Sequence, residues 1–356
     1  MRVLIAPDSF GDTLTAVEAA DAIAAGWKHG RPDDVLVRAP QSDGGPGFVD
    51  VLAVRGGDVL DVTVAGPLSD PVRARWLRVG DVAYIESAQA CGLHLLGRDP
   101  DPESAVTAHS AGVGELVAAA VAAGATTVVV GLGGSGCTDG GRGLVTGLTG
   151  AAPDPDALRT ARDRLAGIRL IAATDVENPL LGPRGAAAVF GPQKGADPAT
   201  VDRLEGRNAA WATVLDSFAG QPVSRAAGAG AAGGLGAALL ALGARRRSGA
   251  DIVAELTEQD ALLRSVDAVV TGEGRFDHQS LGGKVAVAVA RAAHAQGVPA
   301  LVLAGQVALD RADPDLVALA LRGVHSVSDH AGSVRVAMDD AARQLAGLAE
   351  VVAQRW

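Results

Sequence analysis

The chain has 356 residues, of which 48% are hydrophobic and 3% aromatic, and its formal net charge is −10. The acidic balance and scarce aromatic side chains exclude a nucleic-acid partner, and no apolar run reaches the roughly 18 residues needed to span a bilayer. Two cysteines, Cys91 and Cys137, are too few for a disulfide scaffold, so we expect a reduced, cytoplasmic protein with no membrane partner.

Short apolar runs predict strands along the whole chain. In chain order we expect strands at residues 2–6, 35–39, 59–65, 72–78, 82–86, 126–130, 170–173, 266–271, 300–303 and 324–327. Helices are expected from Thr13 or Thr15 towards His29, from about Gly47, and at 112–123 and 197–218. A further helix follows the glycine-rich segment 228–236, and Arg245–Arg247 lie near the end of that helix. The last two helices begin after Lys284 and end at Trp356, respectively. Thr15 and Glu18 have the spacing of a capping box at the start of the first helix.

The order of these elements predicts the fold class. Strands alternate with helices at both ends of the chain, which indicates a parallel α/β sheet with ligands beyond the carboxyl ends of its strands. Consecutive strands from 59 to 86 interrupt the alternation and indicate a second domain. We therefore predict a flavodoxin-like parallel-sheet domain (1–57 plus 250–356) and an inserted mixed α/β domain (58–249), with the active site in the cleft between them.

The segment 266–293 resembles a phosphate-binding strand–loop–helix unit. Its apolar strand is expected to break in a sharp turn at Gly272-Glu273-Gly274. Ser280, Gly282 and Gly283 then lead to Lys284 at the start of a helix, whose N–H groups and dipole favour an anion. The alternative is an ordinary solvated loop.

Lysine is rare in this chain, which otherwise uses arginine for its positive charge. The three lysines are Lys28, Lys194 and Lys284. A flexible point charge suits a phosphate oxygen, so we expect functional roles for Lys194 and Lys284.

Two glycine patterns match the dinucleotide fingerprint, and both are weak. Gly131-x-Gly133-x-x-Gly136 follows a strand, whereas Gly228-x-Gly230-x-x-Gly233 does not. With 47 glycines in the chain such matches arise easily, and no strand-end acid follows at the required spacing. An NAD-dependent dehydrogenase is therefore kept only as an alternative that rests on glycine spacing.

Acidic residues next to glycine recur at the ends of the predicted strands. They are Asp8, Asp43, Asp139, Asp175, Glu273 and Asp277. One such residue is usually a turn former, but several converging on one site would repel one another unless they bound a cation. Carboxylates, glycine-rich anion loops and isolated lysines together indicate Mg²⁺-dependent phosphoryl transfer.

With these features, the sequence resembles the bacterial glycerate kinase family of the glycerate 2-kinase type. The resembling segments are IAPDSF (5–10), SDGGPG (42–47), GLGGSGCTDGG (131–141), TDVENPLLGPRGAAAVFGPQKGA (174–196), GAGAAGGLGAAL (228–239) and VVTGEGRFDHQSLGGKV (269–285). The resemblance implies two domains and transfer of the γ-phosphoryl of ATP to a hydroxyl of D-glycerate or a closely related hydroxy acid, with Mg²⁺.

The chain departs from the family pattern at several positions. Gly11 and Asp12 stand where PDSFKGS has a lysine and a glycine, Pro46 and Phe48 replace the acid and hydroxyl of DGGEGT, and Thr138 replaces an asparagine. The missing lysine favours the alternative of a degenerate member that only binds nucleotide or hydroxy acid.

The predicted site combines these residues by role. Asp8 and Asp175 are unranked candidates for base or metal work, and Glu273 is a further catalytic candidate. Lys194, Arg275 and Lys284 are assigned to carboxylate and phosphate charge. The cofactor-binding candidates are Gly133, Gly134, Ser135, Asp139, Gly230, Gly233, Gly272 and Gly274, and the metal candidates are Asp43 and Asp277. A homodimer is left open.

Overall fold

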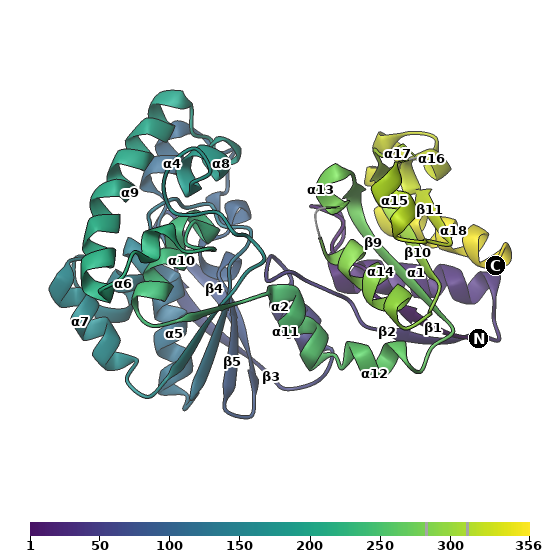
Figure 1. Ribbon diagram of the computed structural model, residues 1–356, viewed down its shortest axis with the longest axis horizontal. Helices are drawn as coiled ribbons and strands as arrows, with labels where there is room; N and C mark the ends of the chain where they lie inside the picture. The colour runs from purple at the N-terminus through teal and green to yellow at the C-terminus, as the bar shows by residue number, and fades with distance from the viewer. Residues whose placement is uncertain (282–283, 311–312) are drawn as a thin grey trace. The chain divides into compact units, whose positions relative to one another are not determined.

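The computed structural model describes residues 1–281, 284–310 and 313–356. The chain forms two compact units (Figure 1). Unit 1 comprises residues 1–42, 50–55 and 253–356, and unit 2 comprises residues 43–49 and 56–252. The segment 43–49 thus groups with unit 2, and the expected glycine pair Gly282-Gly283 lies outside the described residues.

Unit 1 contains a five-stranded parallel sheet in the order β11-β10-β9-β1-β2. Its strands are β1 (Arg2–Ile5), β2 (Val35–Arg38), β9 (Ala268–Phe276), β10 (Ala300–Val307) and β11 (Gly323–Ser326). Counted within the unit, this is the 2-1-3-4-5 order of flavodoxin-like sheets. The parallel sheet predicted from the alternation of strands and helices is confirmed.

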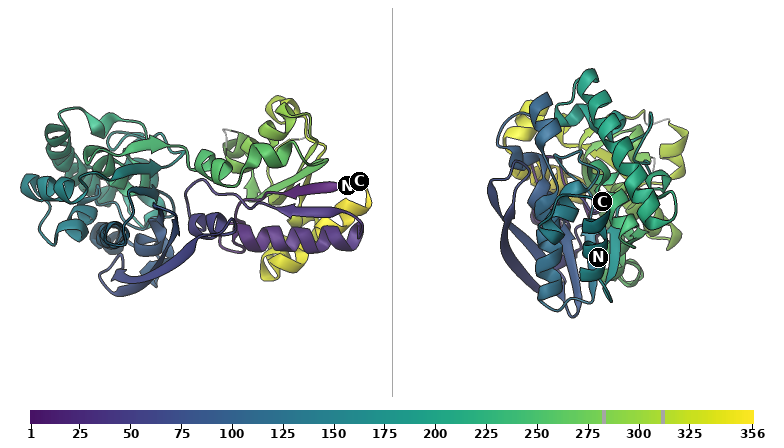
Figure 2. Two further views of the ribbon diagram at one scale, coloured as in Figure 1. Left: turned by 90° about the horizontal axis from the view of Figure 1, so that it is seen from below. Right: turned by 90° about the vertical axis from the view of Figure 1, so that its left-hand side faces the viewer.

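Helices cover both faces of this sheet (Figure 2). Val3 and Ile5 belong to one apolar cluster with α1 (Ala16–Gly30) and α18 (Ala341–Gln354). Leu4, between them, belongs to another cluster with α14 (Val285–Ala295). Successive strand residues point to opposite faces, so a short apolar strand such as β1 needs a helix on each side.

The remaining helices of unit 1 are short. They are α12 (Gln259–Leu263), α13 (His278–Leu281), α15 (Pro314–Ala318), α16 (Val327–Ala331) and α17 (Val334–Asp339), while α2 (Phe48–Ala53) and α11 (Gly249–Leu256) carry the chain from one unit to the other. The capping box at the start of α1 is confirmed, because the Thr15 hydroxyl accepts from the Glu18 N–H and the Glu18 carboxylate accepts from the Thr15 N–H.

Unit 2 contains a mixed six-stranded sheet in the order β3-β4-β5-β6-β7-β8. Its strands are β3 (Asp58–Ala65), β4 (Pro71–Val79), β5 (Val82–Glu86), β6 (Thr127–Gly131), β7 (Arg169–Ala173) and β8 (Arg245–Arg247). The first three pair antiparallel, as predicted from the consecutive strand patterns, and the others continue in parallel.

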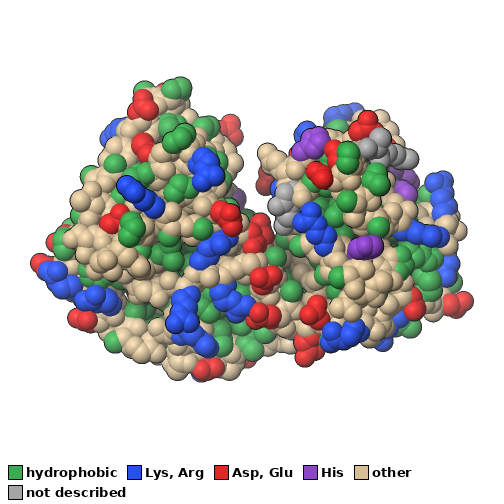
Figure 3. Space-filling view, in the orientation of Figure 1, with side chains coloured by type: hydrophobic (Ala, Val, Ile, Leu, Met, Phe, Trp, Pro, Cys, Tyr) green, Lys and Arg blue, Asp and Glu red, His purple; other side chains and the backbone are tan. Residues whose placement is uncertain are grey.

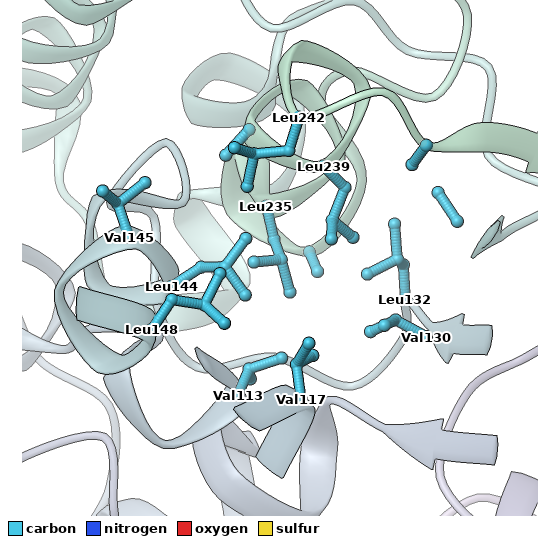
Figure 4. Close-up of a cluster of buried hydrophobic side chains, with 14 of the residues drawn as sticks. Val113, Val117, Val130, Leu132, Leu144, Val145, Leu148, Leu235, Leu239 and Leu242 are labelled. Atoms are coloured by element: carbon cyan, nitrogen blue, oxygen red, sulfur yellow. The ribbon is translucent and has the colours of Figure 1, made fainter. Parts of the chain in front are cut away.

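The helices of unit 2 pack around an aliphatic core. They are α3 (Ala88–Cys91), α4 (Pro102–Thr107), α5 (Ala111–Ala122), α6 (Arg142–Thr149), α7 (Pro155–Arg164), α8 (Ala186–Phe190), α9 (Pro198–Ala219) and α10 (Ala231–Ala241), with 3₁₀ turns at Leu93–Leu96, Pro192–Lys194 and Val223–Arg225. Figure 4 shows Leu235 and Leu239 of α10 gathered with side chains of α5, α6 and β6. This core fixes α10 beside the glycine-rich loop that follows β6.

Two sequence-based predictions of local structure are wrong. Arg245–Arg247 forms strand β8 and not the end of a helix, because Gly243, with φ of +95°, ends the helical segment and residues 245–247 then pair with β7. Residues 272–274 form no turn, because β9 continues to Phe276. A Cβ on Gly272 would lie 2.0 Å from the Leu303 carbonyl oxygen, so this glycine permits close chain packing.

The surface agrees with the composition. On the face seen in Figure 3, Lys and Arg side chains are interspersed with Asp and Glu side chains. Among the described residues, no helix has both the length and the apolar character required to cross a bilayer.

Candidate functional site

A pocket of about 160 Å³ in unit 2 brings together residues from three distant segments. Gly133, Gly134 and Ser135 reach it from the loop after β6, Lys194 from the 3₁₀ turn before α9, and Gly233 from α10. The other lining residues are Leu93, Leu132, Val176, Phe190, Gln193, Ala231 and Ala232. The structure therefore places five of the predicted site residues around one cavity with a mostly apolar wall.

Close backbone packing explains the glycines of the loop after β6. A Cβ on Gly133 would lie 2.4 Å from the Cα of Gly45, and one on Gly134 would lie 2.4 Å from the Pro46 ring. Gly134 also has φ of +65°, where a side chain is strained. The glycine-rich segment 42–47 thus packs directly against the rim of the pocket.

The start of α10 is strained where it borders the pocket. Ala232, Gly233 and Gly234 have φ of +49°, +68° and +97°, so the helix contains three successive left-handed residues. This costs about 1–2 kcal/mol at Ala232, which carries a Cβ. A Cβ on Gly233 would lie 2.0 Å from the Cys137 carbonyl oxygen. Backbone strain of this kind is often found at ligand sites.

Lys194 is the charged group of the pocket and is buried. Its Nζ lies 2.9 Å from Ser135 Oγ and donates to the Cys137 carbonyl oxygen at 2.7 Å. Burial lowers the pKa of the Lys194 ammonium. Within the described part of the chain no carboxylate forms an ion pair with it. A buried cation in this state favours an anionic ligand.

Asp139, predicted to bind cofactor, is engaged inside the protein. Its carboxylate accepts from the Ser110 N–H and hydroxyl at 2.9 Å each, from the Gly143 N–H at 2.9 Å and from the Gly141 N–H at 3.0 Å. These bonds join the start of α5 to the start of α6. They give Asp139 a positioning role in the glycine loop, and direct contact with a cofactor remains a prediction.

Two exposed acidic residues of unit 2, Asp43 and Asp175, adjoin the start of α11. The Asp175 carboxylate accepts from the Ala250 N–H at 3.1 Å, and the Asp43 carboxylate accepts from the Gly45 N–H at 3.0 Å. A Cβ on Gly249 would lie 1.9 Å from the Asp43 carbonyl oxygen, so both acids adjoin the first residues of this helix. Among the described residues, no three His, Cys, Asp or Glu side chains form a group able to hold a metal ion.

Gly230, another glycine predicted to bind cofactor, packs against the chain after β7. Its N–H donates to the Asn178 carbonyl oxygen at 2.8 Å, and a Cβ there would lie 2.3 Å from the Pro179 carbonyl oxygen. Gly230 therefore holds the start of α10 against residues 178–179.

In unit 1, the carboxyl ends of β1 and β9 lie side by side. The Asp8 N–H donates to the Gly272 carbonyl oxygen at 2.8 Å, and the Gly274 N–H donates to the Ser9 carbonyl oxygen at 3.3 Å. These two strands flank the point where the strand order reverses, the usual ligand position in such sheets. Asp8 therefore lies beside the segment of β9 that contains Glu273.

Glu273 is a buried carboxylate at this edge of the sheet. Its Oε2 lies 4.0 Å from Lys284 Nζ, and its Oε1 has no hydrogen-bond partner among the described residues. Burial raises the pKa of Glu273, against the opposing effect of the Lys284 charge. Lys284 occupies the N-cap position of α14, as predicted, and its side chain is 44% exposed. The pair can bind one polar group between charge and carboxylate.

The other predicted residues of β9 and α13 form local contacts. Arg275 Nε lies 3.2 Å from the Asp277 carboxylate, which also accepts from the Gln279 N–H at 2.9 Å at the start of α13. A Cβ on Gly274 would lie 2.9 Å from the Gly11 nitrogen, so this glycine is enclosed by the chain. The metal role of Asp277 and the cofactor roles of Gly272 and Gly274 remain predictions.

Arg246 belongs to a segment that its sequence led us to expect as helical. It lies on β8, where its Nε is buried without a hydrogen-bond partner among the described residues. Its guanidinium lies 3.7 Å from Glu177, and a Cβ on Gly228 would lie 3.3 Å from its Nε. The run of three arginines after a glycine was the signal available in the sequence.

Comparison with known proteins gives a consistent result. The sequence matches the glycerate kinase family over residues 3–356. It is 56% identical to an uncharacterized protein of Mycobacterium bovis over 100% of this chain and 91% of that protein. It is 40% identical to a glycerate kinase of Bacillus subtilis over 87% of this chain and 86% of that protein. A crystal structure from Salmonella typhimurium LT2, assigned as glycerate kinase 2, matches with a TM-score of 0.78 and 34% identity, covering 100% of this chain and 98% of that one.

Proposed function

The chain belongs to the glycerate kinase family, and we propose that it transfers the γ-phosphoryl of ATP to a hydroxyl of D-glycerate or of a closely related small hydroxy acid. The observation that carries this proposal is the pocket in which Lys194 and the glycines of two loops converge. Its apolar wall suits a base or sugar, and its lysine and backbone N–H groups suit phosphate oxygens.

Lys194 would neutralise charge on the nucleotide phosphates. In a buried site the electrostatic effect of a lysine on phosphate is much larger than at a surface. Because no carboxylate pairs with Lys194 among the described residues, its charge is available to a ligand. The hydroxyl of Ser135, 2.9 Å away, provides a further polar contact in the same pocket.

Mg²⁺ would be held by Asp43 and Asp175, two exposed acidic residues that adjoin the start of α11, Asp43 through its main chain and Asp175 through its carboxylate. The proposal is supported by the chemistry of the two residues, because proteins usually bind Mg²⁺ through one or two carboxylates together with water and substrate phosphates. When bound, the ion would neutralise phosphate charge.

The Glu273–Lys284 pair of unit 1 suits a hydroxy acid. Lys284 offers a cation to a carboxylate, and the unpartnered Glu273 Oε1 offers an acceptor to a hydroxyl group. Burial, which raises the pKa of Glu273, also makes this carboxyl better suited to take up a proton from a hydroxyl group. Asp8, beside β9, is a second candidate for this role.

Incubation with ATP, Mg²⁺ and D-glycerate, with ADP formation measured, tests the proposal. Glycerate-dependent ADP formation supports the kinase. Nucleotide binding without turnover supports the degenerate family member favoured by Gly11 and Asp12, and binding of NAD instead of ATP would support a dehydrogenase. We also propose a cytoplasmic location, and a homodimer is tested by solution mass.

A further inference from the structure

A cavity of about 420 Å³ lies in unit 1, beside the terminal strand of the sheet. Its walls come from β11, from the end of β10 with the residues that follow it, and from α15, α16 and α18. Neither Glu273 nor Lys284 lines this cavity. It is therefore a separate site from the charged pair on β9 and α14.

One part of the cavity wall is aliphatic. Leu316 of α15 and Leu348 of α18 are buried, and Val324 of β11 and Val351 of α18 are partly exposed. Leu348, Val351 and Arg355 follow one another at spacings of three and four residues, so they lie on one side of the helix. The helix thus presents two aliphatic side chains and then a guanidinium to the same space, a combination that suits a small ligand with a hydrocarbon part.

The cavity also contains one charged side chain of each sign. Arg355 follows the last turn of α18 and Asp329 lies in α16, and both are exposed. In the part of the chain that the structure describes, neither side chain forms an ion pair. His325 and His330 line the cavity as well, and their ring nitrogens can donate or accept hydrogen bonds. The lining therefore offers both a cation and an anion to a ligand.

The two charged residues border the aliphatic wall from different sides. His330, next to Asp329 in the chain, packs against α18, because a Cβ on Gly347 would lie 3.1 Å from His330 Nε2. Asp329 is thereby held near Leu348. Arg355 stands two helical turns further along, about 10 Å in rise, and its long side chain shortens this distance when it points back along the helix.

We propose that this cavity binds an aliphatic amino acid in its zwitterionic form. The ligand carboxylate accepts from the Arg355 guanidinium, the ligand ammonium donates to the Asp329 carboxylate, and the hydrocarbon side chain packs against Leu348 and Val351. A simple anion would leave Asp329 without a partner, and a simple cation would leave Arg355 without one. A ligand that carries both charges satisfies both residues.

This inference does not rest on the proposed kinase activity, because the site needs neither ATP nor glycerate. A bound amino acid would contact β10, since Val307 lines the cavity. Ala304 of the same strand pairs with Glu273 of β9. The ligand would therefore lie against the strand that neighbours the candidate substrate site.

The test is calorimetric titration of the full-length protein with L-leucine, in the absence of ATP, Mg²⁺ and glycerate. We expect one molecule bound per chain with a dissociation constant of about 1 mM or lower. Two analogues each lack one charge: 4-methylpentanoate has no ammonium, and L-leucinamide has no carboxylate. Each should bind at least about 10-fold more weakly than L-leucine, because one charge-assisted contact is lost.

Two variants remove the matching charges of the protein. Arg355→Gln and Asp329→Asn should each weaken L-leucine binding by about 10-fold. Arg355→Gln should not weaken binding of L-leucinamide, and Asp329→Asn should not weaken binding of 4-methylpentanoate, because the ligand group that each residue would contact is already missing. Ligand-observed NMR measures the weaker complexes.

Arg335→Gln is the matched control. Arg335 is an exposed arginine of α17 that lies 3.7 Å from Asp339 and does not line the cavity. This variant should bind L-leucine like the parent, and circular dichroism of every variant checks folding. Failure of the folded parent to bind L-leucine would overturn the site, and unchanged affinity in both Arg355→Gln and Asp329→Asn would place the ligand elsewhere. Binding of 4-methylpentanoate as tight as that of L-leucine would overturn the recognition of a zwitterion.

Discussion

Replacing Lys284 by alanine tests whether the Glu273–Lys284 pair acts as a charged unit. Glu273 Oε2 and Lys284 Nζ are 4.0 Å apart. At this distance two unit charges attract by about 4 kcal/mol at an effective dielectric of about 20. Because the Lys284 side chain is 44% exposed, solvent screening reduces this value, and we expect Lys284→Ala to lower the free energy of unfolding by about 1–2 kcal/mol.

The pH dependence of this loss has a definite sign. Burial raises the pKa of Glu273 in the folded protein, so its contribution to stability is complete below the unfolded pKa and is lost as pH rises through the folded pKa. Removal of Lys284 raises the folded pKa further. The variant should therefore match the parent below about pH 4, where Glu273 is protonated in both states, and should become less stable at neutral pH.

Catalysis should respond more strongly than stability. We expect Lys284→Ala to lower turnover by one to three orders of magnitude, about 1.4–4 kcal/mol of transition-state stabilisation. Lys284→Arg should restore it only in part, because a planar guanidinium does not replace a point charge. The control is Lys28→Ala, which removes a lysine of the same unit that donates to the Asp34 carbonyl oxygen.

Urea unfolding at several pH values and steady-state kinetics measure both effects. A double variant, Glu273→Gln with Lys284→Ala, removes both charges of the pair and should be more stable at neutral pH than Lys284→Ala alone. Unchanged kcat and KM in Lys284→Ala would refute the catalytic role. Equal instability of the single and double variants would refute the electrostatic coupling.

Three further variants test other parts of the site and fold. Asp175→Asn should keep the fold, because asparagine can also accept from the Ala250 N–H at the start of α11. Turnover should fall at least about 100-fold if Asp175 serves as base or metal ligand, and a fully active variant would show that Asp175 is only a turn former. Gly11→Lys with Asp12→Gly should lower KM for D-glycerate, because each charge changed at about 6 Å contributes up to roughly 3 kcal/mol of attraction to an anionic substrate, and the effect should shrink with added salt. Gly11 has φ of +58°, so the new side chain should cost about 1–2 kcal/mol of stability. Unchanged KM at both low and high salt would place this loop away from the substrate. Asp34→Asn should lower the free energy of unfolding by about 1–3 kcal/mol above about pH 5. Burial raises the pKa of Asp34, but hydrogen bonds from the N-terminal ammonium, Arg31 and Trp27 outweigh it and lower the pKa in the folded protein. The stability contributed by Asp34 is therefore present above its unfolded pKa and lost as pH falls through its folded pKa, so a difference between variant and parent that persists in acid would contradict the assignment.

Local sequence patterns determined the strands other than β8 and several of the helices, in the order in which they occur. The apolar run of β1, the capping box at Thr15 and the consecutive strands β3, β4 and β5 each depend on residues that are close in the chain. Their alternation was sufficient to predict one parallel sheet and one mixed region. The glycine-rich loops and the rare lysines also marked functional candidates, because unusual composition is visible without coordinates.

Tertiary packing decided which candidates share a site and which serve the fold. Ser135 and Lys194 meet only because the 3₁₀ turn Pro192–Lys194 packs against the loop after β6. Asp139 has the same sequence signature as Asp175, yet four internal donors satisfy its carboxylate, whereas Asp175 is exposed. Burial, close chain approach and the pairing of β8 with β7 depend on contacts between distant residues, which local periodicity does not encode.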